Sequence, residues 1–393
     1  MKLDWIRPLL GRKAPFTTVT IDVTRAGDRA DREVEERWRA LRRTLQDAGA
    51  PDSLLDELDD ALDRPVRRPG AGGRVIVATD EDGILVDRVV RRAPTTSTAT
   101  RGPVPDLLHA AIYADENVDH VVALVDRTGA DLVRQGWGAA DVVWRATIEG
   151  SHDEIENVRA GGTSEGRVEN RAADSWERNA EEVAGALDGL VARDAPEAIV
   201  ISGDKRAVGL VEAAVGPRTR SLLIGVPGGS RGPGAKEAAF GAAVLSAVDA
   251  CRAKRRDAVL DRFEELHGQG TRGVASLGDV VAVLRKGQVA ELVLAEDPTA
   301  LDVTLWCGDD PFHLAQTRAE LEDLGAQSLR EVPARVALLR SCIAQDAGLT
   351  FAPEGREPVE GVGAILRWHD VSTPRDGLSA VSRPVQPGAK LPV

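Results

Sequence analysis

The chain has 393 residues, of which 42% are apolar and 3% aromatic, and its formal net charge is −13. This length exceeds what one hydrophobic core usually organises, so we expect two or three domains with mainly aliphatic cores. Proteins that coat duplex DNA non-specifically are usually basic, so the acidic balance argues against DNA binding and leaves RNA contact through local basic patches open. We expect a soluble cytoplasmic protein, because the sequence shows neither a membrane-spanning apolar run nor a signal-peptide pattern.

In the N-terminal third, the alternating β-branched run at 16–24 predicts a strand, and the segments 31–50 and 51–62 predict two helices. Val34, Trp38, Leu41 and Leu45 form the apolar stripe of the first helix. Residues 73–90 predict a hairpin that turns at Glu81 to Gly83. The proline- and threonine-rich segment 91–108 is expected to be an extended link. Together these elements predict an N-terminal α+β domain over residues 1–117.

The middle third predicts a mixed sheet with helices packed on it, in the order β-β-β-α-β-α-β, and a ribonuclease-H-like layout fits this order. Three strand-like runs fill 120–150, with a turn at Asp126 to Gly129. The expected elements that follow are a helix at 172–191, a strand at 197–204, a helix at 206–216, a strand at 220–229 and a long helix at 235–267. This middle domain is predicted to span 118–268.

The last third alternates helix and strand patterns, which is typical of an α/β sandwich whose strands are buried on both faces. We predict an α/β C-terminal domain over residues 269–393. The fold class is therefore α/β with three domains.

Metal and cofactor sites are not indicated by the sequence. Cys251, Cys307 and Cys342 are odd in number and far apart, so they predict buried thiols in a reducing compartment. The histidines are scattered without ligand spacing. A glycine-rich segment at 225–238 lacks the glycine before and the hydroxyl after Lys236 that a phosphate-binding P-loop requires. It predicts a flexible strand-to-helix connection. The basic runs 37–43 and 252–256 predict solvated helix faces.

The strongest candidate site is the segment GGTSEGRVENRAADSWERN, which begins at Gly161 and joins a polar loop to a helix. Gly161 and Gly162 allow the backbone to approach another molecule closely. Arg159, Arg167 and Arg171 can bind phosphates near a helix start, where the helix terminus also favours anions. Residue chemistry alone leaves a nucleic-acid or ligand loop and a surface excursion equally open.

The order of several motifs along the whole chain resembles the bacterial branch of the archaeo-eukaryotic release factor and Pelota superfamily, which includes the mycobacterial and Balon-type ribosome hibernation factors. The motifs are PFTTVTIDV with ERWRALR, then GADLVRQG, then the glycine loop with its helix, and finally GVGAILRW. The resemblance implies that the N-terminal domain faces the decoding centre and that the middle loop reaches the peptidyl-transferase centre. It also implies that the C-terminal domain engages a translational GTPase or other partners.

One position departs from the pattern of the true release factors. Their loop carries a GGQ sequence, whose glutamine helps to place water at the ester carbon, whereas Thr163 stands at that position here. An NIKS-like stop-codon signature is also missing. Our leading hypothesis is therefore a non-enzymatic hibernation or stress factor that occupies the ribosomal A site. It would contact ribosomal RNA and the tRNA acceptor region through Gly161, Gly162, Arg159, Arg167 and Arg171, with no DNA, membrane, metal or cofactor involved.

Two alternatives stay open. A peptidyl-tRNA hydrolase acting in ribosome rescue would use Thr163, Ser164 or Glu165 to position water. An acidic three-domain scaffold would bind another protein and never touch RNA, and an ordered loop at 152–170 in the free protein would favour it.

Overall fold

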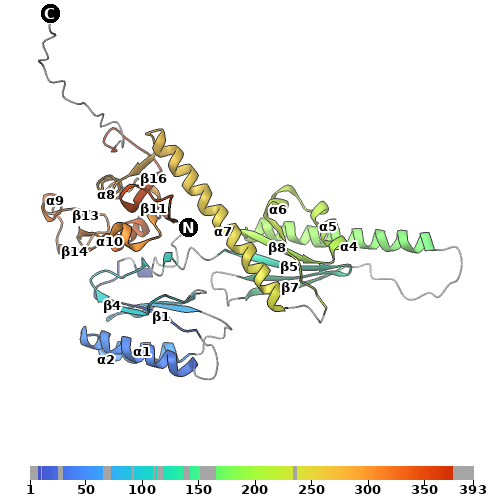
Figure 1. Cartoon of the computed structure of the whole chain (residues 1–393), viewed down its shortest axis with the longest axis horizontal. Coiled ribbons are helices and arrows are strands. Elements are labelled where there is room, and N and C mark those ends of the chain that lie inside the picture. Colours follow the sequence, from blue (N-terminus) through green and yellow to red (C-terminus); the bar gives the residue numbers. More distant parts are fainter. Residues whose placement is uncertain are drawn as a thin grey trace, which may run out of the picture.

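The computed structural model describes residues 8–9, 11–24, 30–64, 72–90, 93–108, 111–112, 118–135, 142–150, 165–232 and 237–374, with the backbone alone at 30–31, 142, 165–174, 237 and 298. These residues form four sheets with helices packed on them (Figure 1). The predicted mixed α/β class is confirmed. None of the helices formed by these residues is both long and apolar enough to cross a bilayer.

The first sheet is antiparallel, with strand order β3-β2-β1-β4. Its strands are β1 (Phe16–Asp22), β2 (Gly73–Thr79), β3 (Gly83–Val90) and β4 (Thr98–Gly102). The predicted strand and hairpin are confirmed. The segment 91–108 was expected to be only a link, but part of it forms β4, which pairs with β1 from Thr98 to Gly102. Local sequence could not show this pairing, because its partner lies about eighty residues away along the chain.

Two helices, α1 (Ala30–Asp47) and α2 (Asp52–Asp63), cover one face of this sheet (Figure 1). The predicted stripe of α1 is buried and packs with Val19 and Ile21 of β1 and with the leucines of α2. Trp38 also donates a hydrogen bond from its indole nitrogen to Asp59 of α2 at 2.6 Å. The polar tip of a buried tryptophan thus gains a partner while its ring stays in the core.

The second sheet is mixed, with strand order β7-β6-β5-β8-β9. The first three strands are antiparallel, and β8 and β9 run parallel to β5. The bounds are β5 (His120–Asp126), β6 (Gly129–Gln135), β7 (Val142–Glu149), β8 (Ala198–Gly203) and β9 (Leu223–Gly225). The strand predicted at 220–229 is wrong in part, because residues up to Leu222 belong to a helix and only a short β9 follows.

Four helices accompany this sheet, namely α4 (Glu165–Asp194), α5 (Lys205–Ala214), α6 (Pro217–Leu222) and the N-terminal half of α7 (Glu237–Gly268). Along α4, the predicted stripe at Ala180, Val183, Leu187 and Leu190 is buried against the sheet. The helix begins at Glu165 rather than at the predicted residue 172. Pro217 starts α6, where its missing N–H and fixed φ suit the first helical position.

The long helix α7 connects two parts of the molecule (Figure 1). Val244 and Val248 pack on the second sheet, whereas Leu260 and Phe263 pack on the third. Val248 and Leu260 are twelve residues apart, so at about 100° per residue the second contact lies roughly 120° around the helix from the first. Each half of α7 therefore buries a different side of one continuous helix.

The last part of the chain forms two sheets, where one α/β sandwich was predicted. The third sheet has the order β10-β16-β11-β15, and the fourth has the order β13-β12-β14. The strands are β10 (Gly273–Ala275), β11 (Val289–Ala295), β12 (Thr304–Cys307), β13 (Leu314–Ala315), β14 (Arg330–Pro333), β15 (Gly348–Ala352) and β16 (Val362–Leu366). The helical segments are α8 (Leu277–Arg285), η2 (Pro298–Leu301), α9 (Arg318–Asp323), α10 (Ala334–Ala344) and η3 (Val359–Gly361). The strand β15, parallel to β11, was not predicted.

The central VGAIL of the motif GVGAILRW forms β16, a fully buried strand between β10 and β11. A Cβ on Gly363 would lie 2.5 Å from the ring of Phe263, so a glycine is required where α7 crosses this strand. This part of the motif is explained by packing.

The first sheet and the C-terminal part share one hydrophobic core. Val75 and Val77 of β2 belong to the same cluster of buried side chains as Leu338 and Ile343 of α10. The first sheet is therefore covered on both faces, by its own helices on one side and by the C-terminal part on the other (Figure 1).

The basic run 252–256 on α7 is engaged in ion pairs, where a solvated helix face was predicted. Arg255 contacts Glu197 beside β8 at 2.6 Å, and Arg256 contacts Glu296 beside β11 at 3.8 Å. These two pairs come from adjacent positions just past the midpoint of α7 and join the helix to the second and third sheets.

Candidate functional site at the base of the glycine loop

Most of the predicted site lies outside the described residues. Arg159, Gly161, Gly162, Thr163 and Ser164 belong to the undescribed segment 151–164. Glu165, Arg167 and Arg171 lie on the first turns of α4, where the structure gives the backbone course. The structure does describe both places where the loop joins the second sheet, namely the end of β7 and the body of α4.

The loop departs from β7 at Gly150, which is held against α4. The amide of Gly150 donates to the carbonyl of Thr128 at 2.7 Å, and the buried Asn179 of α4 donates from Nδ2 to the carbonyl of Arg127 at 2.9 Å. A Cβ on Gly150 would lie 2.1 Å from Asn179 Oδ1, so this close approach requires glycine. The start of the loop is thus fixed to the β5–β6 turn and to α4.

The β5–β6 turn is organised by Asp126. Its Oδ1 accepts hydrogen bonds from the amide and hydroxyl of Thr128 at 2.8 and 2.7 Å and from the amide of Gly129 at 3.1 Å. This is an aspartate-centred turn, in which a short side chain accepts from the backbone two residues later. A Cβ on Gly129 would lie 1.9 Å from the carbonyl oxygen of Ile148 on β7, so the glycine lets the strands close tightly.

An arginine from the glycine-rich segment 225–238 completes this cluster. Arg231 contacts Asp126 at 2.8 Å, donates to the hydroxyl of Thr128 at 2.9 Å and lies 3.3 Å from Asp131 of β6. The predicted flexible connection is thus fastened to the loop base at Arg231.

Electrostatics keep the Asp126–Arg231 pair charged. Burial alone would raise the pKa of Asp126, but hydrogen bonds from Thr128 and attraction to Arg231 outweigh it, and the pKa falls below its usual value. Burial alone would lower the pKa of Arg231, but the two aspartates reverse this effect and raise it. Both shifts favour the charged forms, which suits a pair that holds the loop base together.

The first part of α4 extends past the sheet. Among the described side chains, continuous burial begins at Asn179, and Trp176 lies half-exposed with the guanidinium of Arg206 over its ring at 5.1 Å. At about 1.5 Å per residue, the backbone from Glu165 to Asn179 measures roughly 20 Å. Figure 1 shows this end of α4 pointing away from the rest of the molecule. The helix therefore carries the positions of Arg167 and Arg171 away from the core.

Sequence reasoning placed the turn at Asp126 to Gly129 but missed Asn179 and Arg231. An aspartate two residues before a threonine and three before a glycine is a turn signal, so Asp126 was identifiable as a turn former. Nothing local marked Arg231, because its partners lie about a hundred residues earlier. Within the described part of the chain, no group of three or more histidine, cysteine, aspartate or glutamate residues could hold a metal ion.

Comparison with known proteins identifies the middle of the chain. Residues 119–269 match the family described as Bacterial archaeo-eukaryotic release factor family 2. This match confirms the resemblance to the archaeo-eukaryotic release factor and Pelota superfamily. We call the matched segment the release-factor domain. The release-factor domain includes the whole glycine loop, both of its anchors and all of α7.

The uncharacterized protein Rv2629 of Mycobacterium tuberculosis strain H37Rv is 28% identical over 375 residues, covering 94% of this chain and 97% of that protein. Among solved structures, S. cerevisiae Dom34 covers 77% of this chain and 81% of its own at 9% identity and a TM-score of 0.40. Archaeoglobus fulgidus Pelota covers 75% and 80% at 15% identity and a TM-score of 0.36. Similarity of this degree to solved structures carries no inference about function, and the identification rests on the release-factor domain.

Proposed function

We propose that this protein is a ribosome-associated translation factor that occupies the A site as a hibernation or stress factor and does not release the nascent peptide. The observation that carries the proposal is the release-factor domain at 119–269, whose loop has Thr163 where a catalytic glutamine would stand. Threonine offers a shorter side chain and no amide, so it cannot place water as the glutamine does. The domain would still place its loop in the A site but would not catalyse hydrolysis of the ester bond.

We further propose three functional parts, at residues 1–117, 118–268 and 269–393. By analogy with the superfamily, the first would face the decoding centre, the second the peptidyl-transferase centre and the third a translational GTPase. The second part is supported by the anchored loop base and by the length of α4 beyond the sheet.

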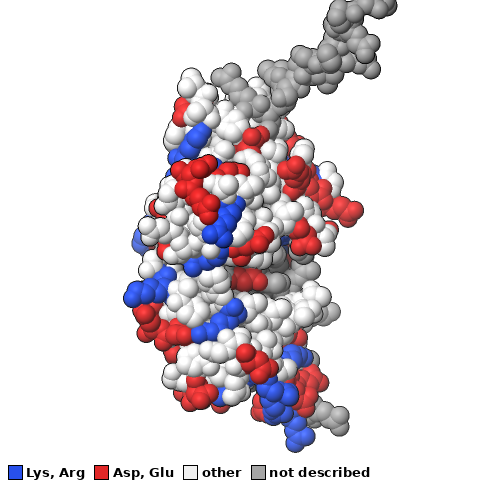
Figure 2. All heavy atoms as spheres, turned by 90° about the vertical axis from the view of Figure 1, so that its left-hand side faces the viewer, with Lys and Arg blue, Asp and Glu red and all other residues white. Residues whose placement is uncertain are grey.

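The contacts with RNA would be local and directed at phosphates. The net charge of −13 disfavours broad electrostatic attachment to RNA. Figure 2 agrees for the face that it shows, where acidic and basic side chains are interspersed. Arg159, Arg167 and Arg171 would instead concentrate positive charge around the loop and the start of α4, where they could bind phosphates of ribosomal RNA or of the tRNA acceptor end.

Co-sedimentation with 70S ribosomes tests the proposal. We expect the protein to pellet with ribosomes at moderate salt, with or without an added translational GTPase, and the triple variant Arg159→Glu/Arg167→Glu/Arg171→Glu to lose at least about tenfold in affinity. The matched control is Arg218→Glu, an exposed arginine on α6 of the same domain. Failure of the unmodified protein to pellet under both conditions would reject ribosome binding and favour the scaffold alternative.

One enzymatic alternative is a peptidyl-tRNA hydrolase, because Gly161 and Gly162 are followed by Thr163, Ser164 and Glu165, whose polar side chains could position water. A peptidyl-tRNA hydrolase would release labelled peptide from stalled ribosome complexes. We expect release no faster than with a Gly161→Pro/Gly162→Pro variant, with an authentic release factor as the positive control. Release clearly above that variant, abolished by Glu165→Gln or Thr163→Val, would replace occupancy by hydrolysis.

A further inference from the structure

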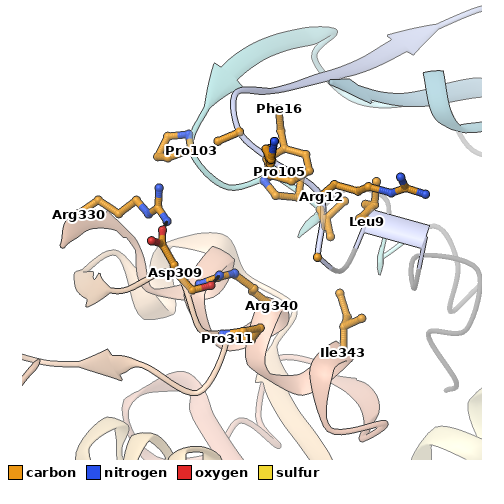
Figure 3. Close-up of a pocket in the computed structure, with 14 residues that line it drawn as sticks. Leu9, Arg12, Phe16, Pro103, Pro105, Asp309, Pro311, Arg330, Arg340 and Ile343 are labelled. Atoms are coloured by element: carbon orange, nitrogen blue, oxygen red, sulfur yellow. Dashed lines mark hydrogen bonds and ion pairs between the residues drawn. The ribbon is translucent and has the colours of Figure 1, made fainter. Parts of the chain in front are cut away.

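A cavity of about 430 Å³ lies between the first sheet and the C-terminal part of the chain (Figure 3). Its N-terminal wall is formed by the segment that enters β1, including Arg12, Lys13 and Phe16, and by two prolines that follow β4. Its C-terminal wall includes Arg330 and Arg340. The volume falls within the range of about 300–1,000 Å³ that is typical of small-molecule sites.

The charge that lines this cavity is unbalanced. Four of its lining side chains are cationic and one, Asp309, is a carboxylate. Arg12 and Lys13 have carboxylate partners on the β2–β3 turn, at 2.9 and 3.4 Å, and Arg330 contacts Asp309. Among the four lining cations, one guanidinium has no ion pair of this kind.

That guanidinium belongs to Arg340. It donates to the carbonyl of Gly308 at 2.8 Å and to the carbonyl of Asp309, and none of the ion pairs found among the described residues involves it. Burial lowers the pKa of Arg340, and attraction to the nearby carboxylates of Asp309 and Asp310 offsets this effect only in part. In addition, Nε of Arg330 is buried without a hydrogen-bond partner. An anionic group bound in the cavity would accept hydrogen bonds from both arginines.

The remaining lining surface is apolar. Figure 3 shows Phe16, Pro103 and Pro105 gathered on the N-terminal side, facing Pro311 and Arg340 across the cavity. A ligand that fits this environment has an anionic group at one end and a flat or apolar body at the other. Inorganic phosphate would satisfy the arginines but leave the apolar wall unused.

We propose that this cavity binds a phosphorylated small molecule of nucleotide size, with its phosphate at Arg340 and Arg330 and its body against Phe16 and the prolines. None of the lining residues belongs to the second sheet or its helices, and the inference does not depend on the proposed ribosomal role. Because its two walls come from opposite ends of the chain, the ligand would fasten the first sheet to the C-terminal part.

Calorimetric titration of the full-length protein with AMP, ADP, GDP and inorganic phosphate tests this inference. We expect saturable binding of at least one nucleotide, competition by inorganic phosphate at higher concentration, and a Tm that rises with nucleotide concentration. Arg340→Gln should weaken nucleotide binding at least about tenfold, because it removes the charge that faces the phosphate. Lys13→Gln, at an exposed side chain, should weaken binding about two- to threefold without affecting the fold.

The control is Arg318→Gln, an exposed arginine of α9 that does not line the cavity, and binding should be unchanged in this variant. Circular dichroism and Tm establish that each variant is folded. If Arg340→Gln does not fold, the weaker nucleotide binding of Lys13→Gln and the competition by inorganic phosphate test the proposal instead. The proposal is overturned if no nucleotide or phosphate binds saturably up to about 5 mM. It is also overturned if binding is unchanged in folded Arg340→Gln, or if a short RNA oligonucleotide binds and the small anions do not.

Discussion

The substitution Arg231→Met isolates the contribution of the ion pair beneath the glycine loop. Methionine keeps much of the aliphatic volume of arginine and removes its charge and donors. The change therefore leaves Asp126 and Asp131 without their shared cation, while the hydrogen bonds from Thr128 and Gly129 to Asp126 can persist. We expect the β5–β6 turn to open more often and the start of the loop at Gly150 to lose its fixed position.

The size of the effect follows from burial. Arg231 has 14% of its side chain exposed and Asp126 has 35%, so the pair lies between surface and core. Exposed pairs contribute about 0–1 kcal/mol, and removal of one partner from a fully buried pair costs about 3–5 kcal/mol. An intermediate cost of about 2 kcal/mol corresponds to roughly thirtyfold faster local opening.

Hydrogen exchange followed by mass spectrometry is the suitable measurement, because a chain with several sheets need not unfold in one step. Peptides covering 120–135 and the end of β7 should exchange roughly thirtyfold faster in Arg231→Met, and peptides from the first sheet should be unchanged. The control Arg193→Met, at a side chain with 68% exposure, should change exchange by less than about threefold. The reasoning fails if the turn peptides respond as weakly as in this control, or if all peptides accelerate equally.

The same pair predicts a dependence on pH. The folded-state pKa of Asp126 lies below its unfolded value, so its contribution is fully present above the unfolded pKa and is lost as pH falls through the folded pKa. The difference between the parent protein and Arg231→Met should therefore be largest near neutral pH and shrink below about pH 4. A difference that grows in acid would contradict this assignment.

Three further predictions concern the rest of the fold. Gly363→Ala should lower the free energy of unfolding by about 1–3 kcal/mol, because the added Cβ meets the ring of Phe263. The control Gly241→Ala, at an open position in α7, should be neutral or stabilising, and thermal denaturation of both variants measures the difference. A thiol reagent at pH 8 should label Cys251 first in the native protein, because it is partly exposed whereas Cys307 and Cys342 are buried. Burial raises the pKa of all three thiols, that of Cys307 to about 11 and that of Cys342 further, so rapid labelling of either buried thiol would contradict this prediction. Arg356→Ala should lower Tm, because this arginine contacts Asp261 and Glu264 of α7 at 2.8 and 2.7 Å. The decrease in Tm should be larger at low salt than at high salt, and a decrease independent of salt would refute an electrostatic origin.

Local periodicity was enough to predict the elements with one clear apolar face. The stripe of α1 at Val34, Trp38, Leu41 and Leu45 is buried as expected, and the β5–β6 turn forms where the sequence places it. Such patterns are set by residues within a few positions of each other, so they can be seen without the tertiary structure.

Non-local arrangements could not be predicted in this way. The pairing of β4 with β1 is set by residues far apart in the sequence, and the first sheet shares its core with α10, near the other end of the chain. Arg340 and Lys13 meet at one cavity for the same reason. For the glycine loop, the sequence identified the segment and its departure at Thr163. It could not identify Asn179 and Arg231, whose partners are brought to them only by folding.

The continuity of α7 has a mechanical consequence. A helix from Glu237 to Gly268 is about 48 Å long at 1.5 Å per residue, and it carries no proline that would let it bend sharply. If the helix pivots at its C-terminal end beside the third sheet, a tilt of about 10° would displace its other end by roughly 8 Å. The second sheet packs on the N-terminal half of α7 and would travel with that end. A small adjustment beside Phe263 would therefore be amplified into a much larger shift of the second sheet, including Gly150 at the end of β7.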